Sequence, residues 1–336
     1  MEVDNAPAVD GPHRIAELWF SDGNVVLQAG TAFYKLHQSI LGMHSPIFKD
    51  MFGIPQPQDG ETKDGCPLVR LPDAEVEVTP FLRALLDPQF FPPHPSTTDF
   101  ATIYGCLRLG HKYEVAFLRQ RGLDHLGSKF RMHLDYFDQQ LHDPEDEERL
   151  AINNTSWEEP EDPSYLLCAI SLAREVDAPW LLPCMFYVLS TRFNDLGSRI
   201  FHGSTCGAIP AQLSRADQEL VVRGCEATTL ATHSIVQRVV AKFLYDVAEC
   251  QDANRCAPVR LILVNNLRAE LGSKEALAQI SYTGYYGGVT LCGVCRKTVE
   301  REHESGRKAF WHELPEIYEF GEWDDLFTLK NQNDAA

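Results

Sequence analysis

The sequence predicts an α+β protein, in which a small sheet with helices is followed by a mainly α-helical domain. Short β-rich runs are confined to residues 25–71, amphipathic helical patterns dominate the rest, and an acidic, polar stretch separates the two halves. With 336 residues and 44% hydrophobic content, the chain has enough apolar material for two domains. We expect the following organisation: a disordered leader at 1–14, an α+β domain at 15–135, an acidic linker at 136–163 and a helical domain at 164–330.

The α+β domain begins with strand signals. The run Val25–Leu27 is β-rich and follows the turn signal at 22–24, and a second strand is predicted over Phe33–Leu36. Leu68–Leu71 alternates apolar and polar residues, which predicts a third strand. The segment 53–66 is rich in glycine, proline and charges, so we expect it to be a surface loop.

Helices are predicted around and after these strands. Ser45 is a capping residue and Pro46 suits the first helical position, so a helix is expected to continue to Phe52. The apolar residues of this helix share one face: Ile47, Phe48, Met51 and Phe52. Four further helical patterns in this domain are Ser39–Met43, Val78–Leu86, Thr102–Tyr113 and Val115–Leu126.

The helical domain is predicted from its apolar periodicity. Tyr165–Val176 and Trp180–Thr191 are strongly apolar, and Pro183 is tolerated because it falls in the first turn of the second helix. Further helices are expected over Ser214–Cys225, His233–Cys250, Pro258–Leu271 and Arg296–Glu313.

Motifs of the first domain resemble those of BTB/POZ domains. Trp19–Leu27 (WFSDGNVVL) is similar to the opening strand of such domains, and Phe33–His37 (FYKLH) to their second strand with its terminal histidine. Ser39–Phe52 (SILGMHSPIFKDMF) resembles the short helix that leads into Ser-Pro-hydrophobe-Phe. Leu107–Val115 (LRLGHKYEV) resembles a helix junction near the end of the domain. The motifs follow in the right order over residues 15–130 and are most similar to BTB proteins of basidiomycete, mushroom-forming fungi.

The resemblance implies a non-enzymatic protein–protein interaction module, acting by self-association or by binding a protein partner. A homodimer through the BTB domain would use the first strand and helix, to which Trp19, Phe20 and Ile47 would contribute. The alternative function is that of a substrate adaptor of a cullin-type ubiquitin ligase, although no copy of the hydrophobe-x-Glu pattern of cullin-binding members is found near residues 53–75.

Four of the ten cysteines form a candidate metal site: Cys250, Cys256, Cys292 and Cys295. Zinc takes four thiolate or imidazole ligands in a tetrahedron, and the Cys-x-x-Cys turn at 292–295 supplies two with suitable geometry. His303 and His312 are substitute ligands downstream. A zinc-dependent regulatory protein is a further alternative function that such a site would imply. The other interpretation of the four thiols is that they remain free and act as small apolar residues.

Composition and missing motifs exclude other classes. A formal net charge of −18 disfavours nucleic-acid binding by the bulk surface. No run of 18 apolar residues and no secretory signal is found, so we expect no membrane association and a cytoplasmic or nuclear location with reduced cysteines. Neither a Gly-x-Ser-x-Gly elbow nor a phosphate loop is present, and we therefore expect no catalytic activity and no cofactor other than zinc.

Overall fold

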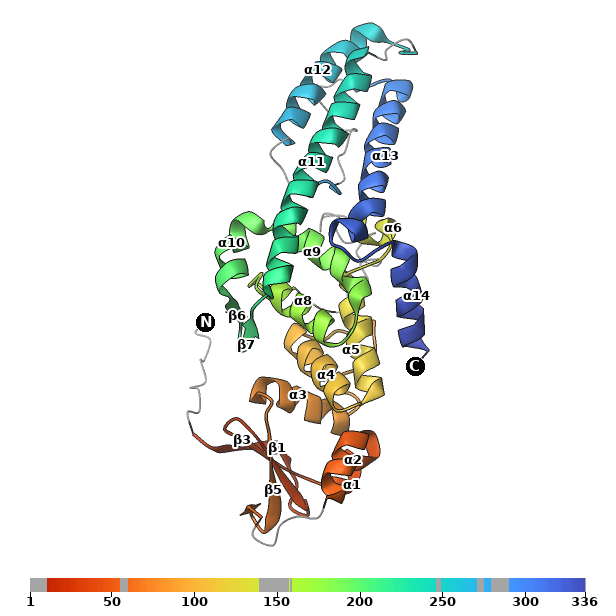
Figure 1. The fold of residues 1–336 in the computed structure, drawn as a ribbon. Helices are drawn as coiled ribbons and strands as arrows, with labels where there is room; N and C mark the ends of the chain where they lie inside the picture. Colours follow the sequence, from red (N-terminus) through yellow and green to blue (C-terminus); the bar gives the residue numbers. More distant parts are fainter. Residues whose placement is uncertain are drawn as a thin grey trace, which may run out of the picture. The chain divides into compact units, whose positions relative to one another are not determined.

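The computed structural model describes most of the chain, and the described residues are 11–54, 60–138, 157, 159–245, 249–270, 275–278 and 290–335. They form two compact units. Unit 1 extends to Ser128 and includes Trp157 and 159–161, and unit 2 holds the other described residues. The α+β class is confirmed, with a small curled sheet in unit 1 and mostly helices in unit 2 (Figure 1). A search of the described helices for one that is long and apolar enough to cross a membrane found none.

Unit 1 contains a five-stranded sheet in the order β1-β3-β2-β5-β4. Its strands are β1 (His13–Trp19), β2 (Val25–Ala29), β3 (Ala32–Leu36), β4 (Thr62–Lys63) and β5 (Cys66–Leu71). β2 and β3 form an antiparallel hairpin, and its turn uses Gly30 at a φ of +56°, in the left-handed region that glycine adopts without strain. β1 pairs in parallel with β3, and β5 pairs in parallel with β2.

The structure adds two strands to the three that the sequence predicts. β1 is one of them, and His13 and Arg14, which fall in the predicted leader, already pair with β3. Residues 1–10 of that leader lie outside the described residues. Leu18 is the one buried residue of β1, and the other six are half-buried or exposed, so no run of buried apolar residues marks this edge strand. The second is β4, which lies within the predicted surface loop 53–66.

The helices of unit 1 are α1 (Gln38–His44), α2 (Pro46–Gly53), α3 (Glu75–Leu86), α4 (Phe100–Lys112) and α5 (Ala116–Lys129). The predicted cap of α2 is confirmed. The Ser45 hydroxyl accepts the N–H of Phe48 at 3.0 Å and donates to the carbonyl oxygen of Tyr113 at 2.6 Å. The rings of Phe48 and Tyr113 stack with their centroids 4.6 Å apart. Ser45 and Phe48 therefore join α2 to the end of α4.

A buried carboxylate joins the start of α3 to the end of α4. Asp73 is only 5% exposed, and it precedes α3. Its carboxylate accepts hydrogen bonds from the Tyr113 hydroxyl at 2.6 Å and from the Lys112 ammonium at 2.5 Å. Burial and this bond raise the pKa of Tyr113 above its usual range. Because a buried charge is costly without partners, this pairing fixes the connection between β5 and α4.

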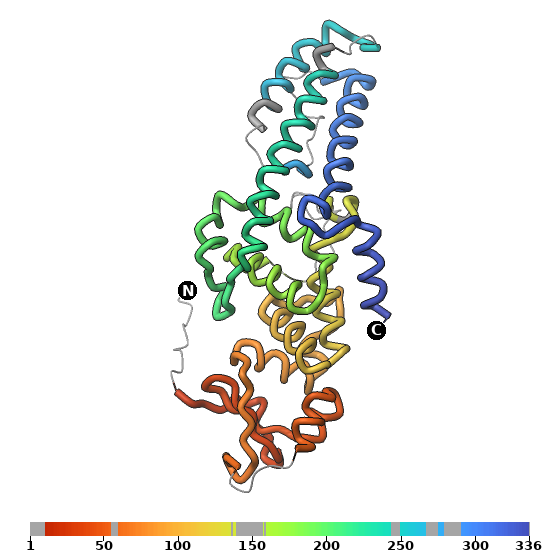
Figure 2. Tube along the Cα trace, viewed as in Figure 1, coloured from red at the N-terminus to blue at the C-terminus, as the bar shows by residue number. Residues whose placement is uncertain are grey.

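Unit 2 is assembled around one long helix, α11 (Arg215–Tyr245), of 31 residues. Its other elements are α6 (Leu134–Asp138), α8 (Tyr165–Glu175), η1 (Pro179–Leu181), α9 (Leu182–Thr191), α10 (Phe193–His202), β6 (Ser204–Cys206), β7 (Ile209–Ala211), α12 (Ala253–Glu270), α13 (Gly293–Ile317) and α14 (Trp323–Asp334). α9, α12 and α13 all pack against α11 (Figures 1 and 2). At Gly224 a Cβ would lie 2.4 Å from the Tyr318 hydroxyl, so glycine is required for this approach.

Several predictions for unit 2 need correction. The predicted helices 214–225 and 233–250 are one continuous helix over Arg215–Tyr245, because the residues between them do not break it. Thr228 and Thr232 are buried there, and each hydroxyl donates to the carbonyl oxygen four residues before it. α10, α14 and the β6–β7 hairpin were not predicted. Of the predicted linker 136–163, residues 139–156 and 158 lie outside the described residues.

We predict that Tyr113→Phe lowers the free energy of unfolding of unit 1 by about 1.5–3 kcal/mol. The substitution removes the buried hydrogen bond that the Tyr113 hydroxyl donates to the Asp73 carboxylate, and hydrogen bonds to charged groups contribute more than those between neutral groups. Hydrogen exchange of unit 1 peptides in increasing urea measures this change in the whole chain. Tyr34→Phe is the matched control. It removes a buried hydroxyl whose partner, Thr79 at 2.8 Å, is uncharged, so about 1 kcal/mol is expected. Equal losses in the two variants would contradict the role assigned to Asp73.

Candidate metal centre

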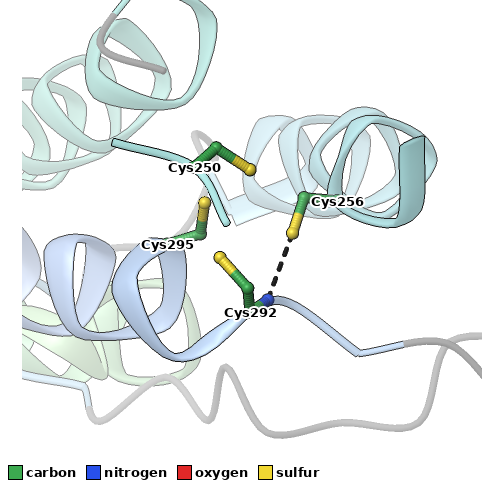
Figure 3. Close-up of side chains that lie close together, drawn as sticks. All are labelled: Cys250, Cys256, Cys292 and Cys295. Atoms are coloured by element: carbon green, nitrogen blue, oxygen red, sulfur yellow. Dashed lines mark hydrogen bonds between the residues drawn. The ribbon is translucent and has the colours of Figure 1, made fainter. Parts of the chain in front are cut away.

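Four cysteine sulfur atoms converge in unit 2, beside the starts of α12 and α13 (Figure 3). The Sγ atoms of Cys250, Cys256, Cys292 and Cys295 all lie within 4.8 Å of one another. A tetrahedral zinc ion with Zn–S bonds of about 2.3 Å sets its sulfur atoms about 3.8 Å apart. Closing the cluster onto an ion therefore needs shifts of about 1 Å or less between sulfur atoms.

Two short segments position these sulfur atoms. Cys250 lies on the turn before α12, and Cys256 lies in the first turn of that helix. Asp252 begins α12, since its carboxylate accepts the N–H of Arg255 at 3.0 Å and its carbonyl oxygen accepts the N–H of Cys256 at 2.9 Å. Cys292 is the N-cap residue of α13 and Cys295 lies in its first turn. Both segments thus bring sulfur to the positive end of a helix dipole, which favours thiolates.

Hydrogen bonds already reach the sulfur atoms. The backbone N–H of Cys292 donates to Cys256 Sγ at 3.1 Å, as the dashed line in Figure 3 marks. The guanidinium of Arg260 donates through Nη2 to Cys295 Sγ at 2.8 Å. Such donors stabilise the charged form of a thiol.

The pKa values of the cluster are spread apart. Burial raises the pKa of Cys295 to about 12 and also raises the pKa of Cys256. Burial acts in the same direction on Cys292, but backbone N–H groups of Cys295 and Gln251 outweigh it and lower its pKa to about 6. The thiolate of Cys292 is therefore favoured near neutral pH, whereas ionising Cys256 and Cys295 requires a cation among the sulfur atoms.

Apolar side chains of three helices surround the cluster. They are Val236 and Val239 of α11, Val259, Leu263 and Val264 of α12, and Leu291 and Val299 beside and within α13. Three of the cysteines are buried and Cys250 is half-buried. Four protein sulfur atoms complete a tetrahedron and leave no position for water or substrate, which is the pattern of a structural metal site.

The predicted cysteine set is therefore brought together, whereas the substitute ligands are not part of it. His303 is buried in α13, and burial lowers the pKa of its imidazole to about 4. His312 lies on the exposed side of the same helix. Sequence reasoning missed Arg260. Its spacing was a usable signal, because a residue four positions after Cys256 lies on the same face of a helix.

The three predicted interface residues lie on two elements of unit 1. Trp19 ends β1 and is half-buried against the sheet, with the Arg14 guanidinium 4.3 Å from its ring centroid. Phe20 follows it and is 39% exposed. Ile47 belongs to α2 and is half-buried. These positions leave apolar surface exposed at the end of the edge strand.

The comparisons with known proteins gave no relative. The sequence matches no family model, and neither the curated proteins nor the solved structures gave a match.

We predict that the purified chain binds one zinc ion and that Cys292→Ser abolishes stoichiometric binding, because one of the four sulfur ligands is lost. Native mass spectrometry of the whole chain measures the stoichiometry. Cys225→Ser is the control, because Cys225 is a half-buried cysteine of unit 2 that lies outside the cluster. Retention of one zinc ion per chain by Cys292→Ser would contradict the assignment.

We also predict that zinc affinity rises with pH. Burial raises the pKa values of Cys256 and Cys295, so both hold protons at neutral pH, whereas the pKa of Cys292 is about 6. Zinc must displace at least the two held protons, so the affinity rises about a hundredfold between pH 7 and 8. Chelator competition across this range measures the slope. A flat profile would show that the ion does not bind these thiols.

Proposed function

We propose that this chain is a non-catalytic protein-interaction protein, with a BTB/POZ-type domain in unit 1 and a helical domain stabilised by zinc in unit 2. The observation that carries the zinc part is the convergence of four sulfur atoms within 4.8 Å from two segments 36 residues apart. An all-sulfur set of this kind suits zinc, with iron as the competitor that metal analysis distinguishes.

The motif order of unit 1 supports the BTB/POZ part of the proposal. The motifs with BTB resemblance occur on a β-hairpin, on a helix begun by Ser45-Pro46 and on the junction between α4 and α5. An interaction role needs accessible apolar surface, and unit 1 supplies it. Large apolar side chains are exposed at Phe20, Met43 and Ile54, by 39%, 71% and 64%.

The edge of the sheet supports self-association or partner binding. β1 is the outermost strand beside β3, so its other edge is not paired within the described sheet. Edge strands of this kind accept further strands from a partner.

All ten cysteines are free thiols, a state that a cytoplasmic or nuclear location would preserve.

We predict that the chain forms a dimer of twice its 37.9 kDa mass through unit 1, and that Phe20→Asp combined with Ile47→Asp shifts it to monomer. A carboxylate placed in an apolar seam costs several kcal/mol unless it finds a partner. Size exclusion with light scattering over a concentration series measures the mass. Phe201→Asp is the control, because Phe201 is 43% exposed on α10 of unit 2 and should leave the dimer intact.

A monomer at every concentration would overturn self-association. A pull-down with a cullin then separates the remaining roles, because binding would identify the adaptor function. Loss of both the dimer and any protein partner in affinity purification would overturn the interaction function itself.

A further inference from the structure

A buried arginine faces the sulfur cluster. Arg260 is 9% exposed, and its guanidinium donates to Cys295 Sγ at 2.8 Å. It lies one helical turn after Cys256 on α12. Buried arginines require a negative partner, because an unpaired buried charge is strongly destabilising.

The partner of Arg260 is unusual for this chain. Arg307, the comparable buried arginine of unit 2, is 2% exposed and is paired with the carboxylates of Asp138 and Glu304. Among the described residues, Arg260 has no such carboxylate partner, and its hydrogen bond goes to sulfur. A neutral thiol would leave the guanidinium charge uncompensated, whereas a thiolate compensates it.

The surroundings point to the same charge state. A pocket of about 240 Å³ opens beside Cys250 and Cys295, and its charged lining residues are Lys242, Arg260, Arg301 and Glu249. Arg301 is exposed and lies 3.6 Å from the carboxylate of Glu302, so the three cations face two carboxylates and one positive charge remains. Four thiolates around one divalent ion carry two negative charges. The pocket lining therefore carries a net positive charge, which offsets part of the negative charge of a fully deprotonated tetrathiolate centre.

We propose that Arg260 supports the metal centre through its hydrogen bond to Cys295 Sγ, which positions this sulfur as a ligand and offsets part of the negative charge of an ion bound by four sulfur atoms. The inference rests on the zinc site proposed above and adds the group that tunes it. Arg260 touches a ligand and not the ion, so it acts as a positioning residue. Outer-shell partners of metal ligands typically change metal affinity by about 10–100-fold.

The two metal states respond in opposite ways to the loss of this charge. With zinc bound, Arg260 stabilises the centre, so its removal weakens binding. Without zinc, four thiolates would repel one another, so the cluster carries less negative charge and compensates the buried Arg260 incompletely. Removal of Arg260 then leaves stability unchanged or raises it. A residue with only a packing role would lower the melting temperature of both states.

The test measures zinc affinity by chelator competition, and the melting temperatures of the zinc-free and zinc-loaded whole chain, for wild type, Arg260→Gln and Arg260→Lys. We expect Arg260→Gln to bind zinc about 10–100-fold more weakly and to melt no lower than wild type without zinc. Arg260→Lys keeps the positive charge but loses the planar set of guanidinium donors, so its zinc affinity should lie between those of wild type and Arg260→Gln. Arg255→Gln is the matched control, since Arg255 is exposed on the same helix and pairs with Asp252 at 3.7 Å.

Cobalt substitution supplies a spectroscopic readout. In Arg260→Gln the d–d bands of tetrahedral Co²⁺ should persist, because all four sulfur ligands remain. The sulfur-to-cobalt charge-transfer band should shift to lower energy, because the lost hydrogen bond raises the energy of the sulfur electrons. Unchanged zinc affinity, or an equal fall in both melting temperatures, would overturn the inference. Failure of the wild-type chain to bind zinc would instead overturn the zinc site itself, and the inference with it.

Discussion

The burial of four cysteine sulfur atoms and one guanidinium at the starts of α12 and α13 constrains how the helices of unit 2 pack. Four cysteine sulfur atoms within 4.8 Å leave room for one ion and little else. The ends of two helices, the turn through Cys250 and the apolar faces of α11 and α12 must all meet there. Without a cation the raised pKa values of Cys256 and Cys295 keep these thiols neutral, and Arg260 has no full countercharge. The convergence of the four cysteines therefore depends on the packing of α11, α12 and α13, and an ion bound there would fix that packing.

Buried charges are also paired in unit 1 and elsewhere in unit 2. Asp73 is held by Tyr113 and Lys112, and Arg307 by Asp138 and Glu304. Each of these charges ties together segments that are distant in sequence, because removing one partner would leave the other charge buried and alone. Arg260 is paired in the same way, with sulfur in place of a carboxylate.

Capping residues and apolar periodicity predicted most helices of this chain, but they could not predict which strands pair or which helices pack together. Ser45-Pro46 marked the start of α2 because capping depends on neighbouring residues. β1 was missed because only Leu18 of its seven residues is buried and because its pairing with β3 is recognised only in the fold. The residues that interrupt the apolar pattern of α11 were predicted to end a helix, yet buried Thr228 and Thr232 satisfy their hydroxyls within it. The candidate ligands could be chosen from the Cys-x-x-Cys spacing, but their convergence required the packing of α12 beside α11.

An ion at this site would also act on the unfolded chain. The two ligand segments are joined by a loop that spans 36 positions between Cys256 and Cys292. A cross-link that closes a loop of this size removes chain entropy from the unfolded state equivalent to about 4 kcal/mol, if coordination acts as a disulfide does. Unlike a disulfide, such a link forms in a reducing compartment, where ten free thiols would stay unpaired. A metal-loaded cluster would thus link the three helices almost as a disulfide does, and this link would depend on the supply of metal and on the charge of Arg260 beside it.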